Sequence, residues 1–286
     1  MLFGFWSFGV SLWLCWVDLR FKIVVVVLFR RGLCLRGVEV VGVEGLPIVR
    51  PGDVLGELIC GAAGRMGWPV RDGDVVVVTH VVVSVAEGLL VNLDEVVPSE
   101  FAKNVASRWG KDPALVEVVL REARGVRRMI DGVLITETKH GFVCANSGVD
   151  KFNIAGERMV ALLPSDADAS AKRIRQEIRK ASGCDVAVIV SDTHGRPLRM
   201  GEMNVAIGVS GLKPIRDRRG EKDLFGYVLR VKQTAVADEL ASAAELVIGQ
   251  AAEGVPVAII RGYHYLQCED GRATELVRPR EKDFFL

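Results

Sequence analysis

The strongest chemical signal in the sequence is the run 191–197 (SDTHGRP), which directly follows the apolar, β-branched stretch 186–190. In open α/β sheets, ligands collect outside the carboxyl ends of the strands. A carboxylate at such a strand end, followed by a hydroxyl, a glycine and an arginine, can hold a hard cation and a phosphate together. The alternative is that Asp192 only caps a turn, and the residue pattern alone does not separate the two interpretations.

A second polar run, 146–153 (NSGVDKFN), follows another expected strand at 142–145. Its glycine allows a tight turn, after which Asp150 and Asn153 can point the same way. Two acidic strand ends, Asp150 and Asp192, would then share one metal ion. The alternative is a loop of Asx turns that satisfies only its own backbone.

The segment 192–232 is basic, with nine Lys or Arg against five Asp or Glu. Charges alternate in sign over 216–223, which is typical of a solvated loop, although an anionic ligand could contact part of it. Arg196 and Arg199 are candidate anion partners because they follow the first run. No aromatic residue lies among these charges before Phe225, so nucleic-acid binding is not expected.

The composition is that of a globular protein: half of the 286 residues are hydrophobic, and 37 Lys and Arg balance 36 Asp and Glu. The six Cys form no C-x-x-C pair, which disfavours a disulfide scaffold or a structural zinc site and suits a reducing, cytoplasmic setting. There is no H-E-x-x-H and neither common phosphate-binding glycine loop. Of the four His, His194 lies inside the candidate site, and the others are expected to be structural or on the surface.

Strand and helix patterns interleave irregularly, so the expected fold class is α/β or α+β, a single domain with a mixed sheet. The side-chain periodicity predicts helices at 54–63, 99–109, 112–119, 165–182 and 235–248. Strands are predicted at 38–43, 75–78, 133–139, 142–145, 186–190, 203–209, 227–231 and 255–261.

The N-terminal segment 1–37 differs from the rest. Residues 2–17 carry no charge and hold three of the five Trp, but charged residues interrupt the stretch before it reaches the roughly 20 apolar residues of a membrane span. Three interpretations stay open: a membrane-surface anchor, an extra element packed on the core, or an upstream stretch that a wrong start assignment has included. Membrane contact is expected only if this segment is native, and the main domain is expected at 38–286.

Several blocks in the right order resemble the coenzyme F420-0:L-glutamate ligase (gamma-glutamyl ligase) family over about 38–262. These blocks are 44–47 (EGLP), 84–88 (SVAEG), 92–96 (NLDEV), 98–99 (PS), 140–150 (HGFVCANSGVD), 191–197 (SDTHGRP), 204–208 (NVAIG) and 237–241 (ADELA).

The resemblance implies an enzyme that joins L-glutamate to the deazaflavin precursor coenzyme F420-0 through an amide bond. It implies use of GTP and a divalent metal, manganese or magnesium, with K⁺ as a further candidate, and an intertwined homodimer. It places metal ligands at Asp150, Asp192, Thr193 and Gln250, with Asp150 and Asp192 as the catalytic pair. Nucleotide contacts would fall on Leu46, Pro47, Ile48, Val49, Asn153, Gly249, Gln250 and Gly254.

The sequence departs from the family pattern at Val81, Val85 and Leu89, where the resemblance predicts Lys, Lys and Arg. A Lys beside a phosphate supplies a positive charge and charge-assisted hydrogen bonds, which Val does not. Neighbouring cations could compensate. Otherwise the chain would be a catalytically silent member that binds nucleotide or deazaflavin, or a ligase for a different carboxylate.

Overall fold

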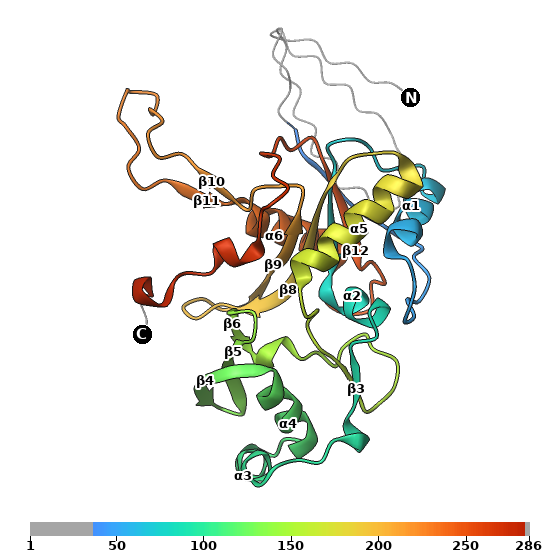
Figure 1. Ribbon diagram of the computed structural model, residues 1–286, viewed down its shortest axis with the longest axis vertical. Coiled ribbons are helices and arrows are strands. Elements are labelled where there is room, and N and C mark those ends of the chain that lie inside the picture. The colour runs from blue at the N-terminus through green and yellow to red at the C-terminus, as the bar shows by residue number, and fades with distance from the viewer. Residues whose placement is uncertain (1–36, 284–286) are drawn as a thin grey trace, which may run out of the picture.

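The computed structural model describes residues 37–283, so the interpretations of the N-terminal segment lie almost entirely outside the described residues. Two lobes are visible in Figure 1, a larger one around a five-stranded sheet and a smaller one below it. The mixed α/β class predicted from the sequence is confirmed. Within residues 37–283, no helix combines the length and apolarity that crossing a bilayer requires.

The main sheet has the strand order β1-β12-β2-β8-β9. β2 and β8 pair in parallel and the other neighbours are antiparallel. All four valines of β2 have no exposed surface, and because successive side chains of a strand point to opposite faces, both faces of the sheet must be covered. The strands are β1 (Glu39–Gly42), β12 (Val257–Arg261), β2 (Val75–Thr79), β8 (Ala187–Gly195) and β9 (Glu202–Ser210).

Three helices cover this sheet. α1 (Leu55–Arg65) packs on α5 (Ala167–Ser182), and α6 (Val236–Ile248) packs against β1, β9 and β12. Asp166 caps α5 by accepting a hydrogen bond from the Ala169 backbone N–H at 2.9 Å. A short helix, α2 (His80–Ala86), begins directly where β2 ends. The sequence reasoning did not predict α2.

The smaller lobe has its own apolar clusters. α3 (Glu100–Trp109) and α4 (Pro113–Glu122) pack beside the antiparallel sheet β4-β5-β6. The predicted caps Ser99 and Asp112 are confirmed, since each accepts a backbone N–H of its helix. The strands are β4 (Ala123–Ile130), β5 (Val133–Thr138) and β6 (Val143–Ala145), while β3 (Leu90–Asn92) pairs with β7 (Met159–Ala161) where the lobes meet.

The strand predicted at 227–231 is wrong. These residues lie on an arm that projects from the larger lobe, based on β10 (Ile215–Asp217) and β11 (Gln233–Ala235) (Figure 1). Tyr227 and Val231 are 60% and 88% exposed. The apolar pattern resembled a strand, but no neighbouring strand pairs with it beyond an isolated bridge between Lys222 and Val228.

Gly56 and Gly61 give a test of the α1–α5 packing. A Cβ at Gly56 would lie 2.3 Å from the Cβ of Glu177, whereas one at Gly61 meets only the end of the Arg65 side chain at 3.4 Å. We expect Gly56→Ala to lower the free energy of unfolding by about 1–3 kcal/mol through overpacking. Gly61→Ala, in the same helix, should raise it by roughly 0.5–1 kcal/mol. Urea denaturation measures both, and equal effects would contradict this packing.

Candidate active site

The candidate site lies at the carboxyl ends of the two parallel strands of the main sheet. β2 and β8 are in register from Val75 opposite Ala187 to Thr79 opposite Ser191. Because parallel strands end at the same edge of a sheet, the residues that follow, His80 and Asp192, emerge side by side. Contrary to the sequence prediction, Asp192 does not follow the end of its strand: β8 continues through it to Gly195, and Asp192 pairs with Val205 of β9 just beyond the last pair of the parallel ladder.

Asp192 is nearly buried, with 8% of its side chain exposed, and polar groups hold both carboxylate oxygens. The Oδ1 atom lies 3.2 Å from His80 Nε2 and accepts the backbone N–H of Thr193 at 2.8 Å. The Oδ2 atom lies 3.1 Å from His194 Nε2. A carboxylate at the edge of the core is thus surrounded by donors.

Asp150 reaches the same point from the smaller lobe. Its Oδ2 atom lies 3.9 Å from His80 Nε2, and its Oδ1 atom accepts the backbone N–H of Phe152 at 2.8 Å. Backbone hydrogen bonds in both directions with Ala161 fix its position beside β7. The structure therefore brings Asp150 and Asp192 to one imidazole, and the metal ion that the sequence predicted they share stays a prediction.

These contacts determine how the groups ionise. Burial opposes the charge on Asp192, but the two imidazoles outweigh it and hold the pKa of this carboxyl well below its usual range. Burial likewise disfavours the imidazolium of His80, yet Asp192 and Asp150 raise its pKa above the ordinary value. Asp192 is therefore ionised throughout the neutral range.

Thr193 and Gln250 form a second polar group with Asn204. The Thr193 hydroxyl lies 2.8 Å from Asn204 Oδ1 and 3.2 Å from Gln250 Oε1. Gln250 also donates through Nε2 to Asn204 at 3.3 Å and to Glu245 at 3.1 Å. Since consecutive side chains of β8 point to opposite faces, Thr193 leaves the strand on the other side from Asp192. The four expected metal ligands thus lie as two pairs around one strand end.

The other expected contact residues are scattered on loops. Leu46 and Val49 pack partly buried against the core, while Pro47 and Ile48 are exposed. Asn153 is exposed with a φ of 55°, and Gly249, which ends α6 at a φ of 75°, leads into the loop that carries Gln250 and Gly254. Among these residues, Gln250 is the one with a hydrogen bond to the site, and the nucleotide contacts stay a prediction.

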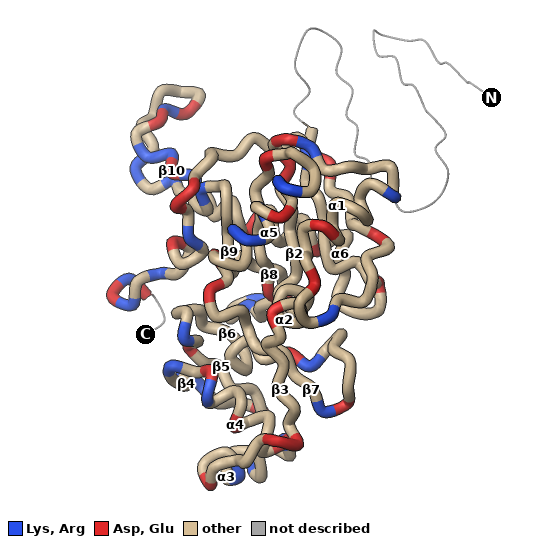
Figure 2. The backbone as a smooth tube through the Cα atoms, turned by 45° about the vertical axis from the view of Figure 1, so that its right-hand side comes forward, with Lys and Arg blue, Asp and Glu red and all other residues tan. Residues whose placement is uncertain are grey.

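The two arginines expected to bind an anion, Arg196 and Arg199, lie at the turn between β8 and β9. Arg196 donates to the carbonyls of Gly201 and Met200 and so stabilises the turn between β8 and β9. Arg199 is exposed at that turn. Figure 2 shows blue and red segments interspersed over both lobes.

The donors fit a hard divalent cation. Within residues 37–283, no three His, Cys, Asp or Glu side chains are arranged as a ready-made metal cluster. Two carboxylates, Asp150 and Asp192, approach one point, whereas the neutral oxygens of Thr193 and Gln250 form a separate pair on the other side of β8. Magnesium and manganese accept such oxygen donors and complete their coordination with phosphate oxygens and water.

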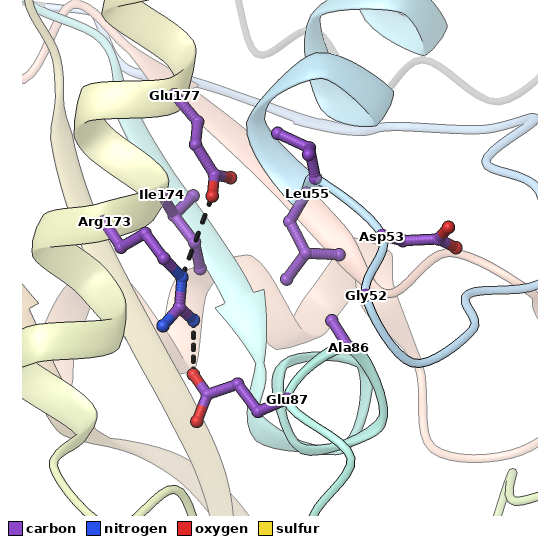
Figure 3. A pocket seen from close by; sticks show the side chains of 9 residues that line it. Gly52, Asp53, Leu55, Ala86, Glu87, Arg173, Ile174 and Glu177 are labelled. Carbon is purple, nitrogen blue, oxygen red and sulfur yellow. Dashed lines mark hydrogen bonds and ion pairs between the residues drawn. The ribbon is translucent and has the colours of Figure 1, made fainter.

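A cavity of about 460 Å³ lies elsewhere, at the other end of α2 from His80. Figure 3 shows Arg173 between Glu87 and Glu177 on its wall. These charges satisfy one another, and Ser170 donates a further hydrogen bond to Glu87 at 2.5 Å. None of the predicted site residues lines this cavity, so we place the chemistry at the strand ends.

Sequence reasoning missed two polar residues of the site, His80 and Asn204. His80 was expected to be structural or exposed, but its side chain is 4% exposed and faces both carboxylates. One signal for it was available, because His80 comes two residues after the predicted buried strand 75–78, much as the 191–197 run follows its own strand. Asn204 gave no such signal, since its role depends on the pairing of β9 with β8.

Comparison with known proteins gives a consistent result. The family described as F420-0:Gamma-glutamyl ligase matches residues 45–262. The Coenzyme F420:L-glutamate ligase of Methanothermobacter thermautotrophicus is 48% identical over 250 residues, covering 87% of this chain and 99% of that protein. Those of Methanocaldococcus jannaschii and Methanopyrus kandleri are 46% and 47% identical, again over 87% of this chain and 97% and 99% of theirs.

The shifted pKa of His80 predicts a pH dependence of stability in chelator-treated protein. Because the folded state raises this pKa above the roughly 6.5 of an unfolded chain, the stabilisation is complete below that pH and is lost as pH rises through the folded value. The pKa of Asp192 is lowered instead, so the stability that its ionised form contributes is present at neutral pH and is lost only in acid. Urea unfolding from pH 6 to 9 should show a steeper loss for the wild type than for His80→Gln. If the free energy of unfolding falls equally with pH in the wild type and in His80→Gln, the raised pKa of His80 is contradicted.

Proposed function

The chain belongs to the F420-0:Gamma-glutamyl ligase family, and on that premise we propose that it joins L-glutamate to coenzyme F420-0 through an amide bond. The observation that carries the proposal is the convergence of Asp150 and Asp192, from different lobes, on one buried imidazole at a strand end. Both residues lie within the matched range 45–262. Addition of further glutamates through gamma linkages belongs to the same proposal.

The reaction needs an activated carboxylate, because a free carboxylate would have to expel oxide. In the proposed mechanism, the γ-phosphoryl group of GTP passes to the carboxylate of the acceptor and forms an acyl phosphate. The amine of L-glutamate then attacks the acyl carbon, and inorganic phosphate leaves. Phosphoryl transfer asks the protein mainly for positioning and for neutralisation of charge.

The residues of this chain fit that task. Asp150 and Asp192 would hold the divalent cation, and Thr193 and Gln250 would form a separate group of neutral oxygen donors on the other side of β8. When bound, such a cation neutralises the negative charge on the phosphate oxygens. Because the pKa of Asp192 is far below neutrality, this ligand needs no deprotonation at working pH. GTP, manganese or magnesium, K⁺ and a homodimer are all parts of the proposal.

One feature favours a second candidate function. Val81, Val85 and Leu89 are partly exposed on and just beyond α2, the helix that begins with His80, and none of them carries a charge. An apolar surface here suits a less anionic acceptor, or a family member that binds its ligands without turnover. The alternative is therefore a ligase for a different carboxylate, or a silent nucleotide-binding relative.

Loss of a proposed metal ligand should abolish most of the activity. We expect Asp192→Asn and Asp150→Asn each to lower kcat/KM for glutamylation at least about 100-fold, since even residues that only support metal ligands contribute 10- to 100-fold. Mass spectrometry of the deazaflavin product, with and without GTP and manganese, measures this. Asp168→Asn is the matched control, because Asp168 is a half-buried carboxylate that accepts backbone N–H groups of Val209 and Ala273 elsewhere. Glutamylation that persists in both site variants would refute the proposed site.

Val85→Lys separates the two candidate functions. Val85 is partly exposed, so the longer side chain can reach solvent without disrupting the core. If the chain is an F420-0 ligase slowed by a missing charge, one charge-assisted hydrogen bond of about 1.5–3 kcal/mol should raise kcat/KM by one to two decades. No product from either protein, with both folded, would favour the silent relative. If the wild type instead acts on another carboxylate, and Val85→Lys lowers that activity, the result would favour a ligase for a different carboxylate.

A further inference from the structure

His80 contacts both carboxylates of the candidate site from a single atom. Its Nε2 lies 3.2 Å from Asp192 Oδ1 and 3.9 Å from Asp150 Oδ2. Asp192 belongs to the main sheet, whereas Asp150 follows the sheet of the smaller lobe. In the described part of the chain, no other cationic or imidazole group has an ion pair with both carboxylates.

The imidazole cannot easily leave this position. His80 is 3% exposed, and the helix that it begins is fixed at its other end. The Ser84 hydroxyl donates to the Leu162 carbonyl at 2.6 Å. Glu87, which caps α2, accepts the Ser170 hydroxyl at 2.5 Å and forms an ion pair with Arg173 of α5 (Figure 3). The helix thus carries its first residue at a fixed place between the lobes.

Two carboxylates brought to one imidazole favour a donor that contacts both, because like charges at one point repel. His194 holds only Asp192, through the other oxygen, and does not reach Asp150. The remaining contacts of Asp150 are to backbone groups of its own lobe. Within residues 37–283, His80 is thus the one side chain whose ion pairs connect the two carboxylates across the lobes.

From this geometry we propose that His80 is a positioning residue: its Nε2 atom, 3.2 Å from Asp192 and at the ion-pair distance of 3.9 Å from Asp150, keeps the two carboxylates at the separation that a shared divalent cation requires. The inference rests on the proposed function only in taking these carboxylates as metal ligands. His80 acts through them and makes no contact with the reacting atoms. A donor at this position, rather than the volume of the ring, is what the site needs.

The test is manganese affinity, measured by electron paramagnetic resonance on the chelator-treated, purified full chain. His80→Phe keeps the ring volume and removes the donor, and we expect its Kd for manganese to rise about 10- to 100-fold. His80→Gln places an amide N–H near the position of Nε2 and should restore the affinity to within about threefold of wild type, as expected for a retained donor. His140→Phe is the matched control, because His140 interacts with the Ser165 carbonyl away from the site and should leave the affinity unchanged.

Circular dichroism and thermal unfolding establish that each variant is folded, and His80→Leu replaces the Phe variant if the latter is not. A folded Phe or Leu variant with wild-type affinity would overturn the proposal, and so would a Gln variant as weak as the Phe variant. The ligase assay is a separate readout. Tight manganese binding that depends on the His80 donor, in a protein without glutamylation, would refute the proposed function and still support the positioning role.

Discussion

The parallel pairing of β2 with β8 decides where each polar group of the site lies. Thr79 opposite Ser191 is the last pair of this ladder, and the next residues are His80 and Asp192. β2 is flanked on its other side by β12, and β8 by β9, so neither strand is free to shift. A slip of one residue would turn every side chain of the shifted strand to the opposite face. The buried valines of β2 resist such a slip, and the apolar core thereby fixes the register of the polar site.

The cost of burying charge explains the arrangement around Asp192. A carboxylate removed from water is strongly unfavourable unless donors surround it, and removal of one partner exposes the full penalty. Here His80, His194 and the Thr193 backbone N–H provide those donors. The contacts of His80 at the start of α2 therefore connect Asp192 of β8 in the main sheet with Asp150 of the smaller lobe.

Family membership and the local sequence of α2 give different information about function. The match extends over most of the chain and includes both carboxylates, Thr193 and Gln250. α2 is nevertheless apolar on its partly exposed positions Val81 and Val85. α2 thus presents a buried imidazole at its start and an uncharged, apolar surface at its partly exposed positions.

The sequence by itself determined the local features of this protein. Ser99, Asp112 and Pro113 specify helix starts through caps that act within three residues, and the β-branched runs specify the buried strands. It also singled out Asp192, but it ended the strand at 190, whereas pairing with β9 extends β8 through Asp192 to Gly195. The tertiary structure alone decided three further points. It brought His80 to both Asp150 and Asp192, placed Thr193 and Gln250 on the other side of β8, and left 227–231 on a projecting arm outside the main sheet. Each of these depends on contacts between residues far apart in the chain, which periodicity and spacing do not encode.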